Sequence, residues 1–298
     1  MKDYSNIGFY PAKKGTLYKT IQQVFNEVVQ ILLKYTDLDA IYCFGFQSHS
    51  LNKQTVLGDT FYKKEKKWEF SLLLMGKNIP ANSTANLADL VTQQLGGKIK
   101  LSLLCYTPKQ IALSNNEHRH LFKKIIQSGW LIYGNPHELV KLNLTNLPDL
   151  NYKGIIEFTQ NRMTIANGFI KNAPLFYDQP LTCAYLVRTA IKQVLLAILY
   201  AYIHYHPNQF HIQYLLQLCT NCCNLSENIF PNTLLELEIC KKLFKTYHND
   251  LRFRSTDIYS KEDVKLFYQC SLSFKDQVEP LIHKRIFKLK SKAYEKRG

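Results

Sequence analysis

The segment from residue 181 to residue 205 is apolar on nearly every side when it is drawn as a helix. No other stretch limits the possible folds of this chain as strongly, because such a helix is stable only where other elements cover it. Its longest uninterrupted apolar run, Val194 to Ile203, is ten residues long, whereas a bilayer span needs about 20. We therefore expect this helix at the centre of a bundle in a soluble protein.

The whole second half of the chain has a helical pattern, interrupted by prolines. The expected helices are 154–172, 181–205, 210–223, 232–250 and 260–288. Ser260 precedes two acidic residues and is a good N-cap for the last of these helices. The final segment, 284–298, holds seven Lys or Arg and one Glu, and we expect it to be a basic, solvated tail.

The first half instead alternates helical and strand patterns, which is typical of a small α/β domain. Helices are expected at 16–35, 86–95 and 114–128, and strands at 40–44, 68–75, 98–106 and 130–133. Glycine or proline follows each expected strand. The fold class is thus a two-domain α+β protein, with an α/β domain at 1–148 and an all-α bundle at 149–298.

The charge is strongly positive, with 38 Lys and Arg against 23 Asp and Glu, a net charge of +15. Both halves contribute to the excess, so it favours a polyanionic partner such as nucleic acid or a nucleotide. No secretory signal follows Met1, and the eight cysteines of a chain this long are expected to be reduced. These features predict a cytoplasmic protein that does not bind membranes.

Two stretches of the first half, 41–48 and 68–74, carry a recognisable pattern. It resembles the minimal nucleotidyltransferase domain, in which a strand enters a Gly-Ser turn and a helix, and a second strand carries an Asp-x-Asp pair. The resemblance covers about residues 15–140. It implies that Gly lets the backbone approach a triphosphate and that carboxylates hold Mg²⁺. The residues that it assigns to nucleotide binding are Gly45, Gln47, Ser48, Glu69 and Ser71.

The catalytic part of this pattern is incomplete. Phe46 occupies the expected serine position, and Glu69 and Ser71 occupy the two aspartate positions. The third expected strand, with its flank to residue 111, has no Asp or Glu. One displaced carboxylate cannot assemble a two-metal site. We therefore expect an inactive domain without a metal or another cofactor, unless Glu69 still binds Mg²⁺.

Four ordered segments of the second half resemble the helices of HEPN domains: 169–173, 181–199, 210–218 and 247–264. A nucleotidyltransferase domain followed by HEPN is a known family architecture. Many HEPN domains are ribonucleases with an Arg-x(4–6)-His motif, but none of the seven arginines here has a histidine at that spacing. We therefore expect binding without RNA cleavage.

Within this half, Arg188, His211 and Arg252 are the candidate nucleotide contacts. Arg188 lies on an otherwise apolar helix, so it either pairs with a carboxylate or faces a phosphate. His211 is interpreted first as a helix-start residue and second as a functional one. Zinc binding by Cys219, Cys222 and Cys223 is not expected, because two spaced ligand pairs are the usual signature.

The combined interpretation is a protein that binds a nucleotide or RNA in a basic cleft between its two domains. The resemblance also implies a homodimer formed through HEPN helices, in a toxin–antitoxin or defence setting. The alternative is an active, Mg²⁺-dependent nucleotidyltransferase that modifies a small molecule, RNA or protein. A dimeric scaffold for another protein is the third possibility.

Overall fold

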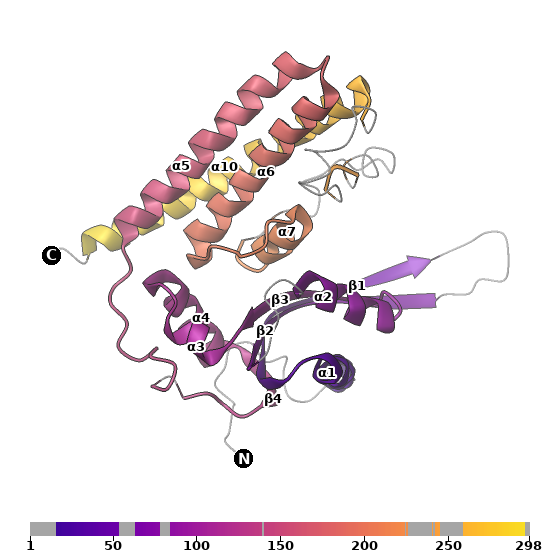
Figure 1. Cartoon of the computed structure of the whole chain (residues 1–298), viewed down its shortest axis with the longest axis vertical. Helices are drawn as coiled ribbons and strands as arrows, with labels where there is room; N and C mark the ends of the chain where they lie inside the picture. Colours follow the sequence, from indigo (N-terminus) through magenta and orange to yellow (C-terminus); the bar gives the residue numbers. More distant parts are fainter. Residues whose placement is uncertain are drawn as a thin grey trace. The chain divides into compact units, whose positions relative to one another are not determined.

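The computed structural model describes residues 16–53, 63–77, 84–138, 140–223, 225, 240, 242–244 and 259–295 (Figure 1). The chain divides into two compact units, Met1–Pro148 and Asp149–Gly298, and each unit is described by itself. All of the described strands belong to the first unit, and the second is helical wherever its elements are described. The expected mixed α+β fold class, with helices following a sheet, is thus confirmed.

The first unit contains one four-stranded sheet, with the strand order β3-β2-β1-β4. Its elements are α1 (Thr16–Tyr35), β1 (Leu38–Lys53), β2 (Lys63–Gly76), α2 (Thr84–Gln94), β3 (Ile99–Tyr106), α3 (Pro108–Ala112), α4 (Asn116–Ser128) and β4 (Trp130–Gly134). The pair β2–β3 is parallel, whereas β1 is antiparallel to both β2 and β4. The parallel pair is joined through α2, as a crossover connection requires.

The main core of this unit lies between one face of the sheet and helices α1 and α2. Helix α1 contributes buried apolar residues at helical spacing: Ile21, Phe25, Val28, Val29 and Leu32. The Phe25 ring contacts the rings of Phe70 on β2 and Trp130 on β4, with centroids 4.8 and 4.9 Å apart. These contacts fix which side of β2 faces the core and which side is left for other functions.

Strand β1 differs from the prediction in a way that matters for the candidate site. The expected strand ends at Gly45, but the observed strand continues to Lys53. Two residues of β1 oppose one residue of β2 between Cys43 and Gly45, which is the arrangement of a β-bulge. Gly45 therefore bends a continuous strand and does not end it. Its pairing with β2, a long-range interaction, overrides the local turn signal of glycine.

The second unit is built around α6 (Pro180–Ile203), which packs against three of the described α-helices and against a short 3-10 helix (Figure 1). These are α5 (Tyr152–Asn172), α7 (Ile212–Thr220) and α10 (Lys261–Glu295); the short 3-10 helix η2 (Ala173–Phe176) follows α5. Among the described helices, α6 alone is long and apolar enough to cross a membrane, but 61% of its most apolar stretch is buried. Its burial is that of a bundle's central helix, as the sequence predicts.

The prediction for helix α10 is correct at its start but not at its end. Its start is confirmed, because the Ser260 hydroxyl accepts a hydrogen bond from the Asp263 N–H while the Asp263 carboxylate accepts one from the Ser260 N–H. Its end is not, because the helix continues through most of the expected solvated tail to Glu295. The expected helix at 232–250 lies largely outside the described residues.

Candidate functional site

The strand residues that resemble a nucleotidyltransferase site do lie together on β1 and β2. In the antiparallel register, Gly45 is opposite Ser71 and Gln47 is opposite Glu69. Directly opposed residues share one face of a sheet, so these four form a single patch. Ser48 is opposite Trp68 and, one residue beyond Gln47, belongs to the other face.

The loop that would hold a triphosphate differs from the expectation. A phosphate cradle needs several backbone N–H groups that converge from a turn or a helix start. Here Gly45 and Gln47 lie within a paired strand, and the chain stays extended until Lys53. The strand end expected at Gly45 is therefore wrong, and the turn that the resemblance implies after it is replaced by continued pairing of β1 with β2.

Glu69, the only expected metal ligand, has a cationic partner. Its carboxylate lies 3.6 Å from the Lys100 ammonium group on β3, in the parallel register of these strands. Ser71 is buried beside it and offers no carboxylate. Among the residues that the structure describes, no group of three or more His, Cys, Asp or Glu side chains could hold a metal ion. The donor set thus does not fit a Mg²⁺ pair.

Two of the three candidate residues of the helical unit, Arg188 and His211, are described by the structure. Arg188 is only 2% exposed, and its Nε donates a hydrogen bond to the carbonyl oxygen of Leu243, 3.3 Å away. His211 is exposed at the N-cap position of α7, but its side chain makes no capping hydrogen bond. Arg252 lies outside the described residues. These arginine and histidine positions do not form a site that can be described here.

Several cysteine and histidine side chains near α7 make packing contacts or hydrogen bonds within the helical unit. The Cys219 thiol donates to the carbonyl of Leu195, and Cys240 lies against Cys270, with their sulfur atoms 3.3 Å apart. His206 packs on the ring of Tyr200, with centroids 4.2 Å apart. His204 ends α6 in the left-handed conformation, with φ at 58°.

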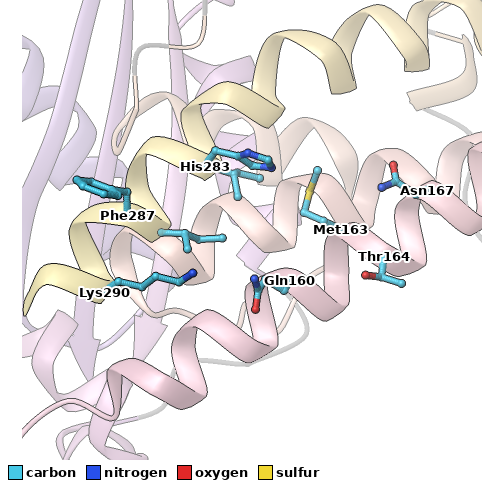
Figure 2. A pocket seen from close by; sticks show the side chains of 9 residues that line it. Gln160, Met163, Thr164, Asn167, His283, Phe287 and Lys290 are labelled. Carbon is cyan, nitrogen blue, oxygen red and sulfur yellow. The ribbon is translucent and has the colours of Figure 1, made fainter. Parts of the chain in front are cut away.

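A groove between α5 and α10 is the best-formed candidate site of the helical unit. Its volume is about 510 Å³, which is within the range of small-ligand sites. Helix α5 contributes Gln160, Met163, Thr164 and Asn167. Helix α10 contributes Ile282, His283, Ile286, Phe287 and Lys290. Figure 2 shows the two sets on neighbouring helices, with the Lys290 side chain extending toward Gln160.

The groove has an apolar base and a polar border. Ile282 and Ile286 are buried, as is Met163, so they form the packed contact between the helices. Gln160, Thr164 and Asn167 are exposed and make no side-chain hydrogen bond to any described residue. They lie at positions i, i+4 and i+7 of α5, which places them along one stripe. Hydrogen-bonding groups along this stripe are therefore available to a ligand.

A face of lysines adjoins this groove on α10. Lys284, Lys288 and Lys292 are exposed and repeat every four residues, which is about 6 Å along a helix. Lys290, two residues from both Lys288 and Lys292, lies on the groove side of the helix instead. No Asp or Glu occurs from Pro280 to Tyr294. Within the described part of the chain, no carboxylate pairs with these four lysines. Like charges at this spacing repel one another, so this face lowers the stability of the helix unless an anionic partner binds it.

Arg285, in the middle of this basic segment, has a different role. Its Nε donates to the carbonyl oxygen of Ala201 at 2.9 Å, and its guanidinium lies over the Tyr202 ring. A cation at the last carbonyls of a helix stabilises that end. Arg285 thus caps α6 and holds α10 against it, while the lysines around it remain exposed.

The sequence contained part of the signal for this site. The basic character of 284–298 is visible in the composition, and Gln160, Thr164 and Asn167 have helical spacing. The packing of α5 against α10 could not be predicted, because neither segment contains a local signal that identifies its neighbour in the fold. Sequence reasoning consequently missed the groove.

Comparison with known proteins gives no match: no family model, curated protein or solved structure is similar to this chain. The fold itself defines the class as a mixed α+β sheet unit followed by a helical bundle. The nucleotidyltransferase and HEPN resemblances stay predictions, and so does the basic cleft between the two domains.

Proposed function

We propose that this protein binds RNA through its phosphates, on the lysine face of α10 formed by Lys284, Lys288 and Lys292, and does not cleave it. The observation that carries the proposal is the row of three exposed lysines at i, i+4 and i+8, without an ion-pair partner among the described residues. Such a row lowers the stability of an isolated helix, and a polyanion would relieve the repulsion.

The absence of cleavage rests on the residues available for chemistry. No arginine has a histidine at the spacing of the HEPN ribonuclease motif. The Glu69 carboxylate is paired with Lys100, and the described residues of the sheet unit supply no group of three or more metal-ligating side chains. The homodimer and the toxin–antitoxin or defence setting remain predictions of the HEPN resemblance.

The test compares two triple variants in the full chain. One replaces Lys284, Lys288 and Lys292 with Gln, and the other replaces Lys77, Lys109 and Lys124, which are exposed lysines of the sheet unit. Each lowers the net charge by three, from +15 to +12, so they differ only in where charge is lost. Fluorescence anisotropy with an oligouridine of about 12 nucleotides gives the affinity.

We expect the α10 triple variant to bind more weakly and with a shallower salt dependence. The slope of log affinity against log salt should fall by about 2, at roughly 0.7 for each phosphate contact on a single strand. The control triple should keep the wild-type slope. Equal losses in the two variants, or no wild-type binding at about 50 mM salt, would overturn the proposal. Gel analysis of the same RNA should show it intact.

A further inference from the structure

Phe287 is the most exposed aromatic side chain of the groove. Its side chain is 73% exposed on α10, although a phenylalanine ring normally contributes to a core. Its neighbours on the helix surface are His283 at i−4, Lys284 at i−3 and Lys290 at i+3. An exposed ring flanked by two lysines can stack on a base while the lysines bind the adjoining phosphates.

The groove beside this ring has the chemistry that a base edge requires. The amides of Gln160 and Asn167 each offer a donor and an acceptor, and the Thr164 hydroxyl offers both as well. All three are exposed and make no side-chain hydrogen bond within the described chain. No acidic side chain lines the groove. Base edges are read by such paired donors and acceptors.

We infer that the α5–α10 groove holds an unpaired nucleobase of the bound RNA, stacked on Phe287 with its edge toward the α5 amides. The inference rests on the proposed function, because the lysines must first hold the phosphates. It adds a substrate class: the site should select single-stranded over double-stranded RNA, since a paired base cannot expose its face and edge together.

The lining favours a base over a helix of an acidic protein partner. Five of the nine lining residues are polar or charged, and the buried apolar ones already pack between α5 and α10. A docked amphipathic helix needs a continuous apolar groove for its anchors. One exposed phenylalanine does not provide such a groove.

The experiment separates stacking from charge. Wild type and Phe287→Ala are titrated with a single-stranded oligouridine, with an abasic ribose-phosphate oligomer of the same length, and with an RNA duplex. Phe287→Tyr retains an aromatic face, and Leu175→Ala removes an equally exposed apolar side chain from η2 as a control. Thermal melts monitored by circular dichroism test whether each variant folds. We expect all of them to fold, because both substituted side chains are exposed.

We expect Phe287→Ala to weaken oligouridine binding by about 5- to 150-fold, the range for losing one stacked base. Its salt dependence and its affinity for the abasic oligomer should stay as in wild type, and Phe287→Tyr should bind normally. Wild type should bind the duplex more weakly than oligouridine of equal charge.

Equal binding of wild type and Phe287→Ala to oligouridine would overturn the inference, as would an equal loss on the abasic oligomer. Competition by polyglutamate as effective as that by oligouridine would also overturn it, because it would show that charge alone is recognised. In each of these cases the lysine variants can still support the proposed function. Failure of the wild type to bind any RNA at low salt would reject both.

Discussion

The Glu69 carboxylate lies 3.6 Å from the Lys100 ammonium group, which is held beside it by the parallel pairing of β2 and β3. An ammonium group at this distance already neutralises the charge that a divalent cation would use, and repels a second cation. The two residues are 31 positions apart, yet the register makes them neighbours. This pair bears directly on the alternative function, Mg²⁺-dependent nucleotidyl transfer.

We expect no transfer from any nucleoside triphosphate in the presence of Mg²⁺, measured by radiolabelling of RNA, protein and small-molecule acceptors. Glu69→Gln should behave like wild type and lose less than about 1 kcal/mol of stability, because the pair is partly solvent-exposed. Labelling that requires Mg²⁺ and disappears in Glu69→Gln would instead establish the alternative function.

Arg188 is expected to act in folding. Arg188→Ala removes the donor to the Leu243 carbonyl and should lower the free energy of unfolding by about 1.5–3 kcal/mol, the scale for a hydrogen bond to a charged group. Both tryptophans, Trp68 and Trp130, belong to the sheet unit, so circular dichroism is the better monitor of this helical change. RNA affinity of the folded variant should not change.

The control for Arg188 is Lys171→Ala at the exposed end of α5, which should leave stability within about 0.5 kcal/mol. If Arg188→Ala melts like wild type and binds RNA more weakly, Arg188 contacts the ligand after all.

Lys192 gives the helical unit a pH dependence. Burial and, to a smaller extent, the positive charge of Arg188 together lower the pKa of Lys192 to about 8. Below pH 8 both the folded and the unfolded state carry the charge, so the folded state bears the full penalty. Between pH 8 and the ordinary lysine pKa near 10.5 the unfolded state binds more protons, so stability rises with pH.

Lys192→Met should therefore be more stable than wild type at pH 7, by on the order of 1–2 kcal/mol, since the group is only half-buried. The difference should shrink as the pH rises toward 10.5. Urea unfolding of both proteins at several pH values measures it, and a difference that does not depend on pH would mean that Lys192 is not destabilised by burial.

Cys223 should be the first cysteine to react with iodoacetamide near pH 7.5. A hydrogen bond from the Cys222 thiol lowers the pKa of Cys223, with burial acting in the opposite sense. Burial raises the pKa of Cys43 and of Cys105 to about 12, so both should react slowly. Time-resolved alkylation followed by peptide mass spectrometry gives the order.

The matched variant is Cys222→Ala, which removes the donor and should slow the alkylation of Cys223. Equal rates at Cys223 in wild type and in this variant would show that its reactivity comes from exposure alone.

The sequence by itself determined the elements whose signals are local. The apolar spacing of 16–35 is observed as α1, and the run at 68–75 is buried in β2. The all-round apolar character of 181–205 predicted the burial of α6, and Ser260 with Asp263 predicted the start of α10. Helix periodicity and capping act over a few residues, so they can be read without knowing the fold.

Only the tertiary structure decided what Gly45, Glu69 and Phe287 do. Gly45 has the local signature of a turn, but pairing with Ser71 keeps it in a strand. Glu69 acquires its cation from another strand, and Phe287 lines a groove together with residues of a helix far away in the sequence. These contacts depend on strand register and helix packing, which are set by the burial of apolar surface across the whole unit.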